Sequence, residues 1–178
     1  MTITDVSQKK PDLILEQYFL GRTFASGIFE DRFGNVRRQF TVDIDGTWDG
    51  QTLTLTEDFT FGDGESETRV WSIKKVAPGS YIGTADDVIG AAKGIVSGNT
   101  LNWKYDMRLK VGGSRVKVHF DDWMFLQPNG VLINKATVSK LGLDIGRVTI
   151  AFTRKADADF LFTLSSTSKE PLAATVGR

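Results

Sequence analysis

Short stretches of alternating apolar and polar residues fill the chain from Arg22 to Arg154, and turns rich in glycine separate them. Alternation with a period of two is typical of β-strands, and the 18 glycines recur between β-branched and aromatic stretches. The pattern predicts about ten consecutive antiparallel strands. The predicted strands are residues 23–33, 36–48, 51–61, 67–76, 81–89, 91–97, 100–111, 115–127, 131–141 and 147–154.

An open sheet of so many strands would expose two unpaired edges, and a closed sheet has none. We therefore expect an all-β fold, a closed antiparallel up-and-down barrel, with one short N-terminal helix over residues 13–20 that follows Pro11 and ends at Gly21. Three segments are expected. Residues 1–10 are a flexible N-terminus, residues 11–154 a single barrel domain, and residues 155–178 a tail that is mostly disordered.

The stretch from Val116 to Gly130 contains the only histidine and two adjacent aspartates. If Gly112-Gly113 is a two-residue turn, one face of this hairpin is apolar except for Asp122. The expected inward pairs are Leu101 with Met124, Trp103 with Asp122, Tyr105 with Phe120, Met107 with Val118 and Leu109 with Val116. The other face pairs His119 with Asp106, so the histidine is interpreted as a surface ion-pair partner.

The first two hairpins are treated in the same way, with Gly34-Asn35 and Asp49-Gly50 as their turns. Both place Phe40 on the inner face of the strand that they share. The same registers place Arg38, on that strand, and Glu57, on the next strand, on the inner face of the sheet. The expected pairs are Gly27 with Val42, Phe29 with Phe40, Asp31 with Arg38, Val42 with Glu57, and Ile44 with Leu55.

A turn over residues 63–65 would place Arg69 and Trp71 inside, with Arg69 diagonal to Glu57. A turn at Pro78-Gly79 would then place Asp86 opposite Trp71. Two small residues, Ala92 and Gly94, fall opposite Tyr105 and Trp103. Such small inner residues indicate either tight packing against aromatic neighbours or an open cavity.

Composition removes several classes of function. The chain has 22 basic and 22 acidic residues, which argues against nucleic acid as a partner. It has no cysteine and one histidine, so no transition-metal site and no cofactor are expected. No apolar stretch reaches about 18 residues, so no transmembrane segment is expected. The N-terminus lacks the apolar region of a signal peptide, which predicts a cytoplasmic protein. The oligomeric state does not follow from the sequence.

The predicted interior contains charged residues, which are costly to bury unless they are paired. One interpretation is a self-satisfied network that joins Glu57 to Arg69 and Asp31 to Arg38. Another is a ligand pocket in which an arginine holds a carboxylate. A third is acid–base catalysis by inward carboxylates, with Glu57, Asp86 and Asp122 as the candidate catalytic residues.

Several motifs, in a fixed order, resemble a bacterial family called domain of unknown function 3833. The motifs are DRFG (31–34), DIDGTWDG (43–50), EDF (57–59), GTADDVIG (83–90), LNWKYD (101–106), HFDDWMF (119–125) and GVLINKA (130–136). The resemblance covers residues 15–154. It implies a barrel of the calycin or lipocalin type and no assigned activity. Many members carry a lipoprotein signal, which this sequence lacks. Genes of the family lie beside genes of enzymes that modify fatty acyl groups, so the resemblance favours a lipid ligand.

These observations predict a barrel that binds an apolar small molecule with an acidic head, such as a fatty acid. The expected ligand-binding residues are the anchors Arg38 and Arg69, the aromatic walls Trp71, Trp103, Tyr105 and Phe120, and the carboxylate of Asp122. The alternatives are a lipid isomerase or cyclase, and a structural or partner-binding module with a filled core.

Overall fold

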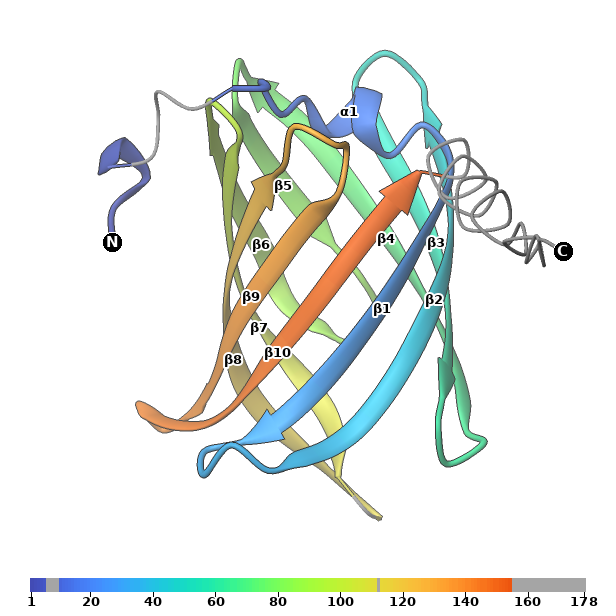
Figure 1. Ribbon diagram of the computed structural model, residues 1–178, viewed down its shortest axis with the longest axis vertical. Coiled ribbons are helices and arrows are strands. Elements are labelled where there is room, and N and C mark those ends of the chain that lie inside the picture. The colour runs from blue at the N-terminus through green and yellow to red at the C-terminus, as the bar shows by residue number, and fades with distance from the viewer. Residues whose placement is uncertain (6–9, 112, 155–178) are drawn as a thin grey trace, which may run out of the picture.

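The computed structural model describes residues 1–5, 10–111 and 113–154 of the chain. Its ten strands form one closed antiparallel barrel, in which each strand pairs with its neighbours in sequence and β1 pairs with β10 (Figure 1). The predicted fold class is confirmed. The strands are β1 (Gly21–Asp31), β2 (Val36–Trp48), β3 (Thr52–Phe61), β4 (Ser66–Ala77), β5 (Ser80–Thr84), β6 (Val88–Ser97), β7 (Thr100–Val111), β8 (Ser114–Leu126), β9 (Leu132–Lys140) and β10 (Leu143–Arg154).

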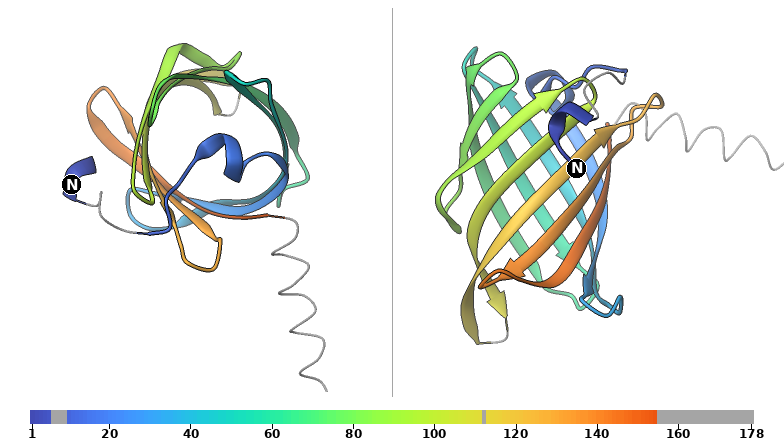
Figure 2. Two further views of the ribbon diagram at one scale, coloured as in Figure 1. Left: turned by 90° about the horizontal axis from the view of Figure 1, so that it is seen from above. Right: turned by 90° about the vertical axis from the view of Figure 1, so that its left-hand side faces the viewer.

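A single α-helix, α1 (Leu15–Tyr18), lies across one end of the barrel, as the end-on view shows (Figure 2). It is shorter than the predicted helix because Ile14 is extended and the amide of Leu13 donates to the carbonyl of Gly98, in the β6–β7 turn. Leu15 and Phe19 are buried, so the helix contributes apolar side chains to this end of the core. Neither α1 nor the 3-10 turn η1 (Ile3–Asp5) is long and apolar enough to cross a membrane, and these are the helices of the described residues.

Gly46 of β2 lets α1 approach the sheet. A Cβ atom at this position would lie 1.7 Å from the backbone oxygen of Phe19, at the C-terminal end of the helix. Only glycine leaves room for so close an approach of two backbones. The position of the helix across the barrel therefore depends on this glycine.

The β7–β8 hairpin has the predicted register, including Trp103 opposite Asp122 and Tyr105 opposite Phe120. Gly94 lies opposite Trp103, as predicted. A Cβ at Gly94 would lie 2.3 Å from the Trp103 ring, and one at Gly83 would lie 2.6 Å from it. These two glycines therefore serve tight packing against an aromatic ring and do not create open space.

The registers predicted for the first two hairpins are wrong by two residues. Phe40 lies opposite Gly27 on β1 and Phe61 on β3, and Ile44 lies opposite Glu57. The turns are longer than two residues, and a bulge interrupts the β1–β2 ladder next to Phe29. A shift of two residues preserves the side of the sheet on which each side chain lies. The inner face was therefore predicted correctly although the pairs were not.

The register predicted for β5 against β4 is wrong by one residue, and the strand is shorter than predicted. The strand ends at Thr84, and a turn over residues 85–87 precedes β6, where the predicted strand runs on to residue 89. Ser72 faces Thr84 and Ile73 faces Gly83, so Asp86 does not lie opposite Trp71. Asp86 is exposed, whereas Asp87 is half-buried and turns toward the interior. A one-residue error exchanges the two faces of a strand.

The predicted segment boundaries enclose the barrel, whose last strand ends at Arg154. The flexibility of residues 1–10 stays a prediction. The tail over residues 155–178 lies outside the described residues.

Candidate functional site

A cavity of about 600 Å³ occupies the interior of the barrel. Leu15 and Phe19 line it at the α1 end, and charged side chains such as Arg37, Asp63 and Arg115 line it near the hairpins at the opposite end. The cavity therefore runs along the barrel from the helix to this opposite end. Cavities that bind small ligands typically have volumes of about 300–1,000 Å³ and mostly apolar walls.

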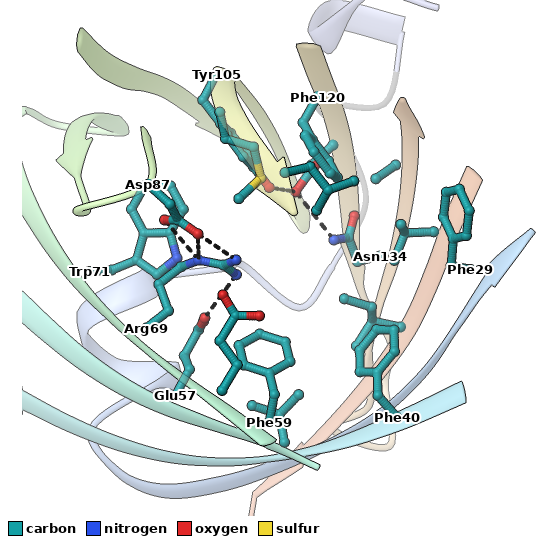
Figure 3. A pocket seen from close by; sticks show the side chains of 18 of the residues that line it. Phe29, Phe40, Glu57, Phe59, Arg69, Trp71, Asp87, Tyr105, Phe120 and Asn134 are labelled. Carbon is teal, nitrogen blue, oxygen red and sulfur yellow. Dashed lines mark hydrogen bonds and ion pairs between the residues drawn. The ribbon is translucent and has the colours of Figure 1, made fainter. Parts of the chain in front are cut away.

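Aromatic side chains form much of the cavity wall (Figure 3). All four predicted aromatic residues line it: Trp71, Trp103, Tyr105 and Phe120. The Tyr105 and Phe120 rings are stacked with centroids 5.1 Å apart, and Trp71 meets Trp103 and Tyr105 edge-on at 5.6 and 5.3 Å. A second aromatic group, from β1, β2 and β3, lines the other side: Phe29, Phe40, Phe59 and Phe61.

Arg69, on β4, lies at the centre of one polar cluster in this wall (Figure 3). Its Nε donates to both carboxylate oxygens of Asp87 at 3.1 and 3.0 Å, and its Nη2 donates to Asp87 Oδ2 at 2.8 Å. Its Nη1 lies 3.9 Å from Glu57 Oε2, and Glu57 is directly opposite Arg69 in the sheet. The predicted proximity of Arg69 and Glu57 is confirmed, and the Asp87 contact was missed because Asp86 was expected to point inward.

Burial decides the direction of the pKa shift for Glu57 but not for Arg69. Burial raises the pKa of Glu57 to about 7, against the opposing charge of Arg69 and with a smaller contribution from Asp87. Burial would lower the pKa of Arg69, but its hydrogen bond to Asp87 and the charges of Glu57 and Asp87 outweigh that effect and raise it. Arg69 is therefore charged and already neutralised by its own neighbours.

Asp122, on β8, belongs to a second polar cluster with Tyr105 and Asn134. The Tyr105 hydroxyl and the Asn134 amide nitrogen both donate to Asp122 Oδ2 over long distances of 3.4 Å. Asp122 Oδ1 and Asn134 Oδ1 are buried without any hydrogen-bond partner among the described residues. Asp122 is 4% exposed and Asn134 2% exposed. Two neighbouring buried acceptors therefore lack a donor, a costly arrangement.

Burial raises the pKa of Asp122 to about 7, although the hydrogen bonds from Asn134 and Tyr105 favour its charged form. Burial and the neighbouring charge of Asp122 raise the pKa of Tyr105 well above its usual value. Asp122 can therefore hold or release a proton near neutral pH. Asn134 was not predicted as a site residue, although its alternation with Leu132 and Ala136 in the same strand indicates the inner face.

The other predicted site residues, Arg38 and Asp86, lie outside the Arg69 and Asp122 clusters. Arg38 is at the cavity mouth, with its side chain 32% exposed, and it pairs with Asp63 and Glu65 at 3.1 and 2.8 Å. The predicted pairing of Arg38 with Asp31 is wrong, because Asp31 binds Arg37 instead. Asp86 is exposed and does not line the cavity.

His119 lies on the outer face, with its Nδ1 2.7 Å from Asp106, as predicted. Within the described ranges, no group of three or more His, Cys, Asp or Glu residues is arranged to hold a metal ion. His119 does not line the cavity, whereas residues of the Arg69 and Asp122 clusters do.

The barrel resembles a solved structure described as the S-type phycobiliprotein lyase CPES from Guillardia theta. The TM-score is 0.57 and the sequence identity 7%, over 87% of this chain and 93% of that chain. At this identity the similarity concerns the fold, which is that of a lipocalin-like barrel. A search of curated proteins gives no significant match. The family model described as protein of unknown function DUF3833 matches residues 1–154, so the chain belongs to that family.

Proposed function

We propose that the barrel binds an elongated apolar small molecule in its interior, with a polar group of the ligand next to Asp122. The cavity of about 600 Å³ carries this proposal, because its walls are mainly aromatic and aliphatic while a few polar groups converge inside it. Such a wall offers apolar burial along most of a ligand and a small number of places for directional contacts.

The charges inside the cavity bear on the polar end of the ligand. The acidic head predicted from the sequence would use Arg69 or Arg38, but Asp87 and Glu57 flank Arg69, and Asp63 and Glu65 bind Arg38. A ligand carboxylate at Arg69 would have to coexist with these carboxylates, which is favourable only when Glu57 is protonated.

The Asp122 cluster favours a different head group. Two buried oxygens, Asp122 Oδ1 and Asn134 Oδ1, need a hydrogen-bond donor. A hydroxyl or an N–H group on the ligand supplies that donor, whereas a carboxylate or an ester does not. We therefore favour an apolar alcohol or amine, and a fatty acid is the competing ligand.

Binding competition distinguishes these ligands. We expect native mass spectrometry of the purified protein to detect a bound apolar molecule. At pH 8, where Asp122 is charged, a primary alcohol should displace a fluorescent apolar probe at a concentration about tenfold lower than the methyl ester of the same chain length does, as expected for one hydrogen bond to a charged acceptor. Tighter binding of the fatty acid would instead place the head group at an arginine.

Variants at two adjacent aspartates provide the matched comparison. Asp122→Leu should abolish the preference for the alcohol, while Asp121→Leu, on the outer face, should preserve it. Ala136→Phe, which fills the cavity next to Asp122, should prevent binding of every ligand without unfolding the barrel. Undiminished binding in Ala136→Phe, or an empty protein that accepts no apolar ligand, would contradict the proposal and favour a structural module.

Acid–base catalysis is the second candidate, and the pKa values of Glu57 and Asp122 near 7 favour it. An isomerase of this kind would move a proton on an unsaturated lipid held in the cavity. We would expect a fed unsaturated fatty acid to be converted by the wild type and by Asp121→Asn, but not by Asp122→Asn. Recovery of unchanged lipid from all three proteins would favour a carrier.

A further inference from the structure

The β1–β2 and β9–β10 hairpins lie at the end of the barrel opposite α1 (Figure 1). Their tips expose large apolar side chains. Phe33 is 73% exposed in the β1–β2 hairpin, and Leu141 and Leu143 are 94% and 69% exposed in the β9–β10 hairpin. These hairpins are neighbours because β1 pairs with β10. Exposed apolar residues gathered in one region of a surface indicate an interaction site.

Leu141 has a backbone φ of 49°, the left-handed conformation that glycine adopts readily and a bulky residue does not. Gly142 follows it with a φ of 77°, so the pair forms a tight turn between β9 and β10. A leucine at this position is unfavourable both for the backbone and for the exposed side chain. A contact that buries the leucine would compensate for both costs.

Charge is distributed unevenly around the same end of the barrel. Three hairpins that are adjacent in the closed sheet, over residues 30–37, 108–117 and 140–147, hold eight basic and three acidic residues. On the other side, residues 61–67 hold three acidic residues and no basic one. The chain has no net charge, yet one side of the cavity mouth is basic and the other acidic.

Most of these basic residues have no carboxylate partner within the part of the chain that the structure describes. They are Arg32, Arg108, Lys110, Arg115, Lys140 and Arg147. Lys110 and Arg115 are also directly opposite one another in the β7–β8 ladder. Like charges in register repel, and a negatively charged surface relieves that repulsion.

We propose that the tips of the β1–β2, β7–β8 and β9–β10 hairpins dock onto an anionic lipid surface. Phe33, Leu141 and Leu143 enter the boundary between head groups and acyl chains, and the basic side chains face the lipid phosphates. The Arg32 guanidinium, 4.7 Å from the centre of the Phe33 ring, places a positive charge beside an inserted aromatic side chain. Docking requires no ligand. Docking at this end would also let an apolar ligand pass between the membrane and the cavity mouth, and that step rests on the proposed function.

Co-sedimentation of the full chain with lipid vesicles tests the proposal. We expect binding to vesicles of equal parts phosphatidylcholine and phosphatidylglycerol, weak binding to phosphatidylcholine alone, and a decrease as salt rises. Lys110→Glu combined with Arg115→Glu should weaken binding at least about tenfold. Phe33→Ser combined with Leu141→Asn should do the same, and asparagine tolerates the left-handed backbone at position 141.

Matched variants on the barrel wall serve as controls. Lys93→Glu with Lys135→Glu changes the same amount of charge, and Val70→Ser with Ile95→Ser removes two exposed apolar side chains, so both double variants should bind as the wild type does. The cavity-filling Ala136→Phe should also bind vesicles, which keeps this result separate from the outcome for the ligand. Failure of the wild type to bind anionic vesicles, or equal losses in the wall variants, would overturn the proposal. A dimer that Phe33→Ser abolishes would assign the tips to a second copy of the chain.

Discussion

Asp121 and Asp122 are adjacent in β8, yet the side of the sheet on which each lies gives them different chemistry. Asp121 faces outward, where it accepts a hydrogen bond of 2.7 Å from Asn102 and lies 3.8 Å from Lys104. Asp122 faces the cavity with two long hydrogen bonds and one unpaired oxygen. The protein thus keeps Asp121 solvated and Asp122 desolvated, and desolvation gives Asp122 a preference for its proton near neutral pH.

This preference predicts a dependence of stability on pH. The folded pKa of Asp122 is raised to about 7, above its ordinary value, so the folded state binds a proton more tightly than the unfolded state does. The free energy of unfolding should therefore fall as pH rises from about 4 to about 7, by at most about 1.4 kcal/mol per pH unit for this group. Asp122→Asn should reduce that slope and stabilise the protein at pH 8, where the carboxylate is charged. Urea denaturation across this pH range measures both effects.

Glu57, whose pKa is also raised to about 7, should retain its own part of the slope in the Asp122→Asn protein. Asp45→Asn, which changes an exposed carboxylate 3.3 Å from Arg22, is the surface control. An Asp122→Asn protein with the slope of the wild type would show that Asp122 stays ionised in the folded protein throughout this range.

At the scale of an element, α1 and β2 are linked by one close approach. Gly46→Ala would place a methyl group 1.7 Å from the Phe19 oxygen, so the helix must move away from the sheet. We expect a loss of at least about 2 kcal/mol in the free energy of unfolding, measured from denaturation midpoints. Gly62→Ala, whose new methyl group would lie 3.6 Å from its nearest neighbour, should change stability little. Similar losses in the two variants would mean that the helix position does not depend on Gly46.

The strands also show which kinds of error a sequence-based register tolerates. In the β1–β2 and β2–β3 hairpins the predicted pairs are shifted by two residues, and the inner face is still correct because side chains alternate with a period of two. In β5 the predicted strand continued beyond Thr84, so Asp86 was expected to point inward opposite Trp71. Asp87 points inward instead and binds Arg69. The Asp-Asp pair offers no local signal that distinguishes its members. The turn over residues 85–87 decides between them, and where it begins depends on how β5 pairs with β4 and β6.

At the scale of the whole molecule, closure followed from the cost of exposed sheet edges, but the cavity did not follow from the sequence. Small inner residues were compatible with either packing or open space. Gly83 and Gly94 prove to be covered by the Trp103 ring, whereas Ala136, next to Asp122, lines the cavity. Only the orientation of each large ring decides which small residue leaves a void, and that orientation is set by residues on several strands at once.

Closure itself makes a last prediction, which concerns the seam between β1 and β10. Successive amides of a strand point to its two neighbours in turn, and β1 is paired with β10 and with β2 along residues 24–29. In a closed barrel every amide of this stretch is hydrogen-bonded, so hydrogen exchange followed by NMR should show all of them protected, as in residues 100–104 of β7, which pair with both β6 and β8. If β1 were instead the edge of an open sheet, every second amide would exchange rapidly. An alternating pattern in β1 beside uniform protection in residues 100–104 of β7 would therefore contradict closure, while uniform protection in both stretches would show that β1 is paired on both sides and closes the sheet.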